Sequence, residues 1–193
     1  MPIDAPRPPA PAKVRILAVA DELFYHEGIR NVGVERILEQ ASVTRATFYK
    51  HYRSKEHLII AYVRGRHEMV QRDIQLVRDS VASPVEALLL IAEFVGDVAR
   101  REGFHGDPFF DAAAFFDDPE HAVRIVVAEH RSWERGVLRE LLTEADYRGD
   151  LDGAVEELML LRDGSLMGTD VGESAAVGAA LHRAVRRMLK ADS

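Results

Sequence analysis

The chain contains no cysteine and no apolar run near the ~20 residues that a membrane-spanning helix requires. The missing thiols exclude a disulfide framework and thiol chemistry. The N-terminus has no basic region followed by an apolar run, so we expect no signal peptide and a cytoplasmic location. The sequence also lacks a glycine-rich phosphate loop, a serine elbow and a metal-ligand pair. We therefore expect no catalytic residues, no cofactor and no enzyme activity.

Acidic residues dominate, with 32 Asp and Glu against 25 Lys and Arg, and the net charge is −7. The excess acid is not spread evenly. Residues 1–58 hold nine basic and seven acidic side chains, whereas residues 59–193 hold sixteen and twenty-five. Within the first part, positive charge gathers at Arg45, Lys50, Arg53 and Lys55. Phosphate contacts depend on the local electrostatic field more than on net charge. The acidic balance of the whole chain therefore does not exclude a nucleic-acid-binding surface in residues 1–58.

Apolar residues recur at helical spacing, and no segment shows convincing strand alternation. Hydrophobic residues make up 47% of 193, enough for the core of one large or two small domains. We predict an all-α fold of about nine helices. It divides into a proline-rich disordered tail (1–12), a head (13–58) and a body (59–193). The tail is either uninvolved or a short arm that brings Arg7 and Lys13 near DNA.

The most specific pattern is VERILEQASVTRATFYKHYRSKEHL, residues 34–58. One apolar helical stripe comprises Val34, Ile37, Leu38 and Ala41. Ser42 follows in a tight turn, and Thr44 is placed to cap a second, short helix. In that helix Phe48 and Tyr52 stand at i and i+4 and are expected to face inward. This arrangement is a helix-turn-helix.

The opposite side of the second helix is polar. It presents Arg45, Ala46, Thr47, Tyr49, Lys50 and His51, a set that suits base edges and phosphates. Ser54 is placed to cap the next helix, whose free N–H groups, with Lys55, suit a phosphate. The pattern therefore indicates a DNA-binding head.

This sequence resembles the TetR family of bacterial transcriptional regulators from Ile16 to about Tyr62. The run TFYKHYRSKEHL is the specific part, and the spacing of Leu17, Ala20, Leu23, Phe24 and Gly28 agrees with it. The resemblance implies base or groove contacts from Arg45, Ala46 and Thr47, phosphate contacts from Tyr49, His51 and Lys55, and either kind from Lys50. Thr44 completes the expected DNA-binding set.

Four positions depart from the family pattern. Ser42 stands where glycine is common, and a left-handed backbone would cost serine about 1 kcal/mol more than glycine. Ala46 also replaces a frequent glycine, Leu38 a common alanine, and Gly33 a capping threonine. None of these breaks the motif, but no known operator sequence carries over to this chain.

The body is expected to consist of amphipathic helices. They are 55–79, a helix from Pro84 to Gly103, a short aromatic helix between Pro108 and Pro119, 120–145, 151–167 and 173–190. Regulators of this kind usually bind a small-molecule effector in the body. The candidate pocket residues are Phe94, Phe110, Phe116, Trp133 and Met159, with Arg131 and Asp163 as polar anchors. Aromatic residues at helical spacing are more often plain core, so that alternative stays open, and Trp133 is the strongest candidate for the pocket.

Histidines and acids in the body invite a metal-site hypothesis. The residues concerned are His105, Asp107, His121, Glu129 and His130. Their spacing matches no tight ligand motif, so we expect no metal and either solvated or helix-capping histidines. Glu68 beside His67 points to a different helix face, and we expect no acid–histidine dyad there.

The last two helices bear apolar faces and small residues. The small residues are Gly168, Gly172, Ala175, Gly178 and Ala179. They either complete the core or meet a second subunit, and the resemblance implies a homodimer through these helices. Two heads related by a two-fold axis read half-sites ~34 Å apart. We expect a ligand-responsive repressor of a palindromic double-stranded operator. Two alternatives remain: a helical interaction module whose head no longer reads specific DNA, and a ligand-binding or hydrolytic body.

Overall fold

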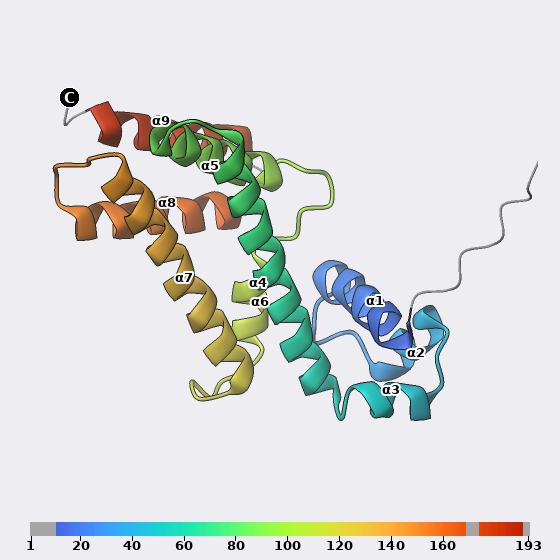
Figure 1. Cartoon of the computed structure of the whole chain (residues 1–193). Helices are drawn as coiled ribbons and strands as arrows, with labels where there is room; N and C mark the ends of the chain where they lie inside the picture. The colour runs from blue at the N-terminus through green and yellow to red at the C-terminus, as the bar shows by residue number, and fades with distance from the viewer. Residues whose placement is uncertain (1–10, 169–173, 191–193) are drawn as a thin grey trace, which may run out of the picture. The chain divides into compact units, whose positions relative to one another are not determined.

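Helices make up all the regular structure of residues 11–168 and 174–190, the part that the computed structural model describes (Figure 1). They are α1 (Ala12–Glu27), α2 (Val34–Ala41), α3 (Arg45–His51), α4 (Lys55–Ser80), α5 (Pro84–Ala99), α6 (Pro108–Ala114), α7 (Ala122–Glu144), α8 (Leu151–Gly168) and α9 (Ser174–Lys190). The all-α prediction is confirmed. Residues 1–10 of the expected tail lie outside the described residues, and Ala12 already belongs to α1.

The ends of α5 show which sequence signals set a helix boundary. Ser83 caps its start by accepting a hydrogen bond from the Glu86 backbone N–H at 3.2 Å, and Pro84 occupies the first turn, as expected. The predicted end at Gly103 is wrong. The helix stops at Ala99, and Gly103, with φ 78°, belongs to the turn that follows. A glycine near the end of an apolar run marks the turn, not the last helical residue.

The chain divides into two compact units, residues 1–62 and 63–193, and the boundary falls inside α4. In the first unit, α1 packs against both α2 and α3. Its core comprises Ile16, Ala20, Leu23, Phe24, Ile29, Val32, Ile37, Ala41, Phe48, Tyr52, Leu58, Ile59 and Tyr62. The rings of Phe24 and Tyr62 meet edge to face with centroids 5.6 Å apart, a favourable aromatic geometry.

The turn between α2 and α3 uses a strained backbone. Ser42 has φ 50° and ψ 55°, the left-handed conformation expected at this position. Its N–H donates to the Glu39 carbonyl at 3.2 Å, and the Val43 N–H donates to the Leu38 carbonyl at 3.1 Å. These bonds satisfy the last carbonyls of α2 and fix the direction in which the chain enters α3.

Replacing Ser42 by glycine is expected to stabilise the first unit by about 0.5–1 kcal/mol, because glycine adopts positive φ without the serine penalty. Ser42 is exposed, so the change removes no packing. Urea denaturation followed by circular dichroism measures the effect, with S42A as the control that keeps the strain. An S42G variant no more stable than S42A would contradict the argument.

In the second unit, α5 packs against α7, α8 and α9, α8 packs against α7 and α9, and α6 packs against α7. The core cluster is Ala87, Leu88, Ala92, Leu141, Leu142, Ala154, Val155, Leu158, Leu181 and Val185. Within this unit Arg78 ties α4 to α7, donating to Glu140 at 3.1 Å and Glu144 at 2.8 Å. Residues 169–173, including the predicted interface residue Gly172, lie outside the described residues.

Candidate functional site

The short helix α3 is held by its buried side so that its polar side is exposed. Thr44 accepts a hydrogen bond from the Thr47 N–H at 3.1 Å and so caps the helix, as predicted. Phe48 and Tyr52 are buried in the core of the first unit. The exposed residues of α3 and its cap are Thr44, Arg45, Ala46, Tyr49 and Lys50, with Thr47 and His51 half-buried beside them. The helix thus presents the residues expected to contact DNA.

Arg45 is paired in the structure with an acid from the preceding helix. Its guanidinium contacts the Glu35 carboxylate of α2, and both side chains are largely exposed. An exposed ion pair contributes about 0.2–1 kcal/mol, so the guanidinium can exchange this partner for a base or a phosphate at small cost. Glu35 nevertheless places a negative charge at the tip of the polar face.

Replacing Glu35 by glutamine is expected to raise DNA affinity by up to about fivefold. The substitution removes the competing partner of Arg45, worth at most about 1 kcal/mol, and a charge that repels phosphate. Fluorescence anisotropy with a labelled duplex measures the affinity. Glu27→Gln is the matched control, because it removes the acid of the Glu27–Arg36 ion pair and neither of these residues belongs to α3. Equal affinities for E35Q and wild type would show that the Arg45–Glu35 pair does not compete with DNA.

The start of α4 follows the prediction only in part. Ser54 accepts a hydrogen bond from the His57 N–H at 3.2 Å and so caps the helix. The Lys55 ammonium, however, donates to the Ile29 carbonyl at 2.6 Å and lies 5.8 Å from the Phe24 ring centroid. Burial lowers the pKa of Lys55. Lys55 therefore connects α4 to the loop after α1, and its phosphate contact stays a prediction.

Three of the seven predicted effector residues meet in the second unit. Arg131 of α7 makes a two-pronged ion pair with Asp163 of α8, at 3.0 and 2.6 Å. Its guanidinium carbon also lies 5.0 Å from the Phe110 ring centroid, within the range of a cation–π contact. Met159 is buried and Trp133 half-buried. The site thus combines one aromatic ring with a paired polar anchor.

The other two predicted aromatic residues have separate partners. Arg101 lies over the Phe94 ring, with its guanidinium carbon 5.7 Å from the centroid. Phe116 stacks on His121 at 3.6 Å. Their role in the effector pocket stays a prediction.

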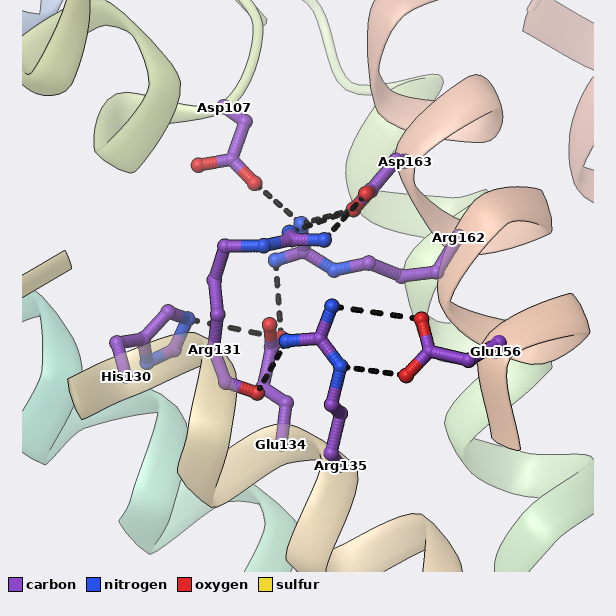
Figure 2. A network of polar contacts seen from close by, with 8 residues as sticks. All are labelled: Asp107, His130, Arg131, Glu134, Arg135, Glu156, Arg162 and Asp163. Carbon is purple, nitrogen blue, oxygen red and sulfur yellow. Dashed lines mark hydrogen bonds and ion pairs between the residues drawn. The ribbon is translucent and has the colours of Figure 1, made fainter. Parts of the chain in front are cut away.

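A buried ion network adjoins this site (Figure 2). Arg162, the residue at its centre, was not among the residues predicted from the sequence. Arg162 of α8 contacts Asp107, the cap of α6, and also lies 3.0 Å from Glu134 and 3.1 Å from Asp163. The Asp107 side chain is only 1% exposed. Burial would lower the pKa of Arg162, but the three acids outweigh it and raise the pKa. The guanidinium therefore offsets the negative charge that these carboxylates bring into the protein.

The expectation for the histidines is confirmed at His121 and wrong at His130. His121 caps α7 by accepting a hydrogen bond from the Val123 N–H at 3.2 Å. His130 is neither solvated nor a cap, since it is 1% exposed. Its Nδ1 lies 2.9 Å from Nδ1 of His67, which belongs to α4. The two residues are 63 positions apart in the sequence, too far for a local spacing rule to link them.

An open depression of about 700 Å³ lies beside α7 in the second unit. It is lined by Pro119, Glu120, Arg124, Ile125, Ala128, Glu129, Ser132 and Trp133. Trp133 is the one predicted pocket residue in this lining. In the described ranges, 11–168 and 174–190, no group of three or more metal-ligating side chains occurs, and no helix is long and apolar enough to cross a bilayer.

Comparisons of the sequence and of the structure with known proteins point to one and the same family. Residues 16–62 match the family of bacterial regulatory proteins described as tetR. The chain is 33% identical to SCO4454, a TetR-family transcriptional regulator of Streptomyces coelicolor, covering 94% of this chain and 96% of that one with a TM-score of 0.88. It is 25% identical over 153 residues to the transcriptional repressor KstR2 of Mycolicibacterium smegmatis, covering 77% of this chain and 74% of the repressor.

A shorter match concerns the uncharacterised regulator Rv1255c of Mycobacterium tuberculosis, at 34% identity over 76 residues. It covers 39% of this chain and only 38% of that relative's length. The full-length match to SCO4454 therefore carries the family assignment.

Proposed function

The chain belongs to the TetR family of bacterial regulatory proteins, and on this premise we propose that it is a repressor that a small-molecule effector releases from a palindromic operator. Members of the family are DNA-binding transcriptional regulators, and this chain is one of them. The single observation that carries the proposal is the capped helix α3 with its exposed polar side. A protein that acts on operators works where the DNA is, so we infer a cytoplasmic location.

The proposed DNA complex contains two copies of the chain. A homodimer formed through α8 and α9 would present two α3 helices to half-sites ~34 Å apart, one helical turn of DNA. Arg45, Ala46 and Thr47 would reach base edges, and Tyr49 and His51 the phosphates, with Lys50 free to do either. Exposed apolar side chains on α8, Leu160 at 71% and Met167 at 58%, support a surface that a second subunit covers.

The proposed effector site is the polar anchor formed by Arg131 and Asp163 with the ring of Phe110. Support comes from their geometry, because an aromatic face beside a partly buried ion pair suits a ligand with one polar group on an apolar frame. An effector releases DNA only if it binds the released state more tightly than the operator-bound state. The effector must therefore interact differently with this site in the released state and in the operator-bound state.

Selection of bound sequences from a random duplex pool tests the function, using the full chain at about physiological salt. We expect an inverted repeat whose half-sites are one helical turn apart. The matched control is an Arg45→Ala/Lys50→Ala double variant, checked by circular dichroism, which should not enrich that repeat. Enrichment of no sequence by the folded wild type would instead favour the helical interaction module. The selected operator then serves to screen effectors by release.

A further inference from the structure

Two imidazole rings meet inside the second unit. Nδ1 of His67 on α4 lies 2.9 Å from Nδ1 of His130 on α7. One face of the His130 ring stacks on Phe109, with centroids 3.6 Å apart and planes 9° apart. Trp133 contacts both histidines, at 5.4 Å from the His67 ring and 5.8 Å from the His130 ring. The aromatic neighbours hold the rings in place without supplying further hydrogen bonds.

A contact between two Nδ1 atoms at this distance requires one proton between them. A neutral imidazole has one donor and one acceptor nitrogen, and a protonated imidazole has two donors. The pair keeps its hydrogen bond when both rings are neutral or when one of them is protonated. With both rings protonated, two N–H groups face each other and the bond cannot form. The His67–His130 contact therefore depends on the number of protons that the pair holds.

The charges of the ion network next to the pair are not balanced. The buried network holds three carboxylates, Asp107, Glu134 and Asp163, against two guanidinium groups, Arg131 and Arg162. One negative charge is left over, and an isolated buried charge is costly.

The excess charge lies close to the histidines. Nε2 of His130 faces Oε1 of Glu134 at 3.5 Å, and no hydrogen-bond partner reaches the buried Oε2 of the same carboxylate. His130 therefore presents a ring nitrogen to the carboxylate that carries part of the excess charge.

Protonation of His67 is opposed on several sides. Burial, and then the charge of His130, lower the pKa of His67, and Arg64 on the same helix acts in the same direction. Glu129 of α7 and Glu68 of α4 act in the opposite direction and are outweighed. The folded protein therefore resists protonating His67 at a pH at which the unfolded chain accepts the proton.

We propose that His67 and His130 form an acid-sensitive latch between α4 and α7, which is closed by the hydrogen bond between their Nδ1 atoms and opens when both rings are protonated. The direction of the pH dependence of stability follows from the lowered pKa of His67. Below the ordinary histidine value of about 6.5, the unfolded chain binds more protons than the folded one, so stability falls as the pH falls. The latch contributes its full stability above that pH. This contribution is lost as the pH drops through the pKa that His67 has in the folded protein.

The single tryptophan of the chain reports on the latch directly. Trp133 touches both rings, and a protonated imidazole quenches indole emission more than a neutral one. We expect the wild-type emission to fall in one step between pH 7.5 and 5, with a midpoint below 6.5, while far-UV circular dichroism stays constant. His67→Gln should abolish the step, and His105→Gln, an exposed histidine of the same unit, should retain it. A flat wild-type curve, a step that survives in H67Q, or a step that coincides with loss of helicity would each overturn the proposal.

Nitrogen NMR of the histidine rings gives a second test that needs no variant. At pH 7.5 we expect one of the two facing Nδ1 atoms to carry a proton and the other to accept it. Two unprotonated Nδ1 atoms would leave no hydrogen bond between the rings and would overturn the proposal.

The consequence for DNA rests on the proposed function, since α4 carries both His67 and Lys55. With the selected operator, lowering the pH from 7.5 to 6 should change wild-type affinity by a larger factor than that of H67Q. Equal factors would overturn the regulatory part of the proposal. An intact fluorescence step in a protein that binds no operator at any pH would count against the proposed function and would leave the latch standing.

Discussion

Replacing Arg162 by methionine is expected to destabilise the second unit by about 3–5 kcal/mol, the usual cost of leaving buried charges without their partner. Methionine keeps much of the side-chain length but leaves Asp107, Glu134 and Asp163 without the guanidinium that joins them. The loss should lower Tm by roughly 10 °C or more. Differential scanning calorimetry and urea denaturation measure it.

Arg135→Met is the matched control for this prediction. Arg135 pairs with Glu156 at 2.7 Å, but both side chains are exposed, so the cost should stay below about 1 kcal/mol. If R162M is as stable as R135M, the network is not a stabilising feature of the fold.

The pH dependence of R162M gives a further check. Burial would raise the pKa of Glu134, but His130, whose Nε2 lies 3.5 Å from Oε1, and the charge of Arg162 outweigh it and lower the pKa. A lowered carboxylate pKa contributes stability above its unfolded value of about 4.3, and this stability disappears as the pH falls. Wild type should therefore lose stability in acid, and the gap between wild type and R162M should narrow.

Replacing Arg45 by alanine is expected to lower operator affinity by about 1–3 kcal/mol per half-site, roughly five- to 150-fold, and to relax the preference at the base it contacts. The guanidinium stands at the exposed tip of α3 and can form two hydrogen bonds to one guanine edge. Anisotropy titrations against a panel of single-base operator variants measure both effects. Arg36→Ala is the control, an exposed arginine of α2 paired with Glu27. A uniform loss across the panel, with no change in base preference, would make Arg45 a phosphate contact.

Lys55→Ala provides the contrasting result. A phosphate contact from Lys55 predicts weaker binding to every sequence and a salt slope lower by about one. An unchanged slope would mean that the ammonium serves only to hold the Ile29 carbonyl, the partner it has in the structure.

The head was largely predictable because its signals are local. The caps at Thr44 and Ser54 act over three residues, and the i, i+4 spacing of Phe48 and Tyr52 fixes which side of α3 is buried. Lys55 was harder to place because its partner Ile29 is 26 residues away. Sequence reasoning could assign its charge but not the carbonyl it would meet.

The body was predictable as helices but not as a site. Arg131 and Asp163 were chosen as separate polar anchors, and their ion pair spans 32 residues. Arg162 and Asp107 are 55 residues apart, and no periodicity relates them. A buried arginine on an amphipathic helix looks like any surface arginine in the sequence, because only tertiary packing decides which one loses its water.

The shared carboxylate of Asp163 constrains how such a protein can diverge. It binds both Arg131 and Arg162, so a substitution that suits a new ligand at Arg131 also alters the charge balance around the second guanidinium. Mutations at these three positions are therefore not additive. Adaptation to a different effector would have to proceed through compensating pairs of changes, and a screen of single substitutions would discard many of the useful ones as misfolded.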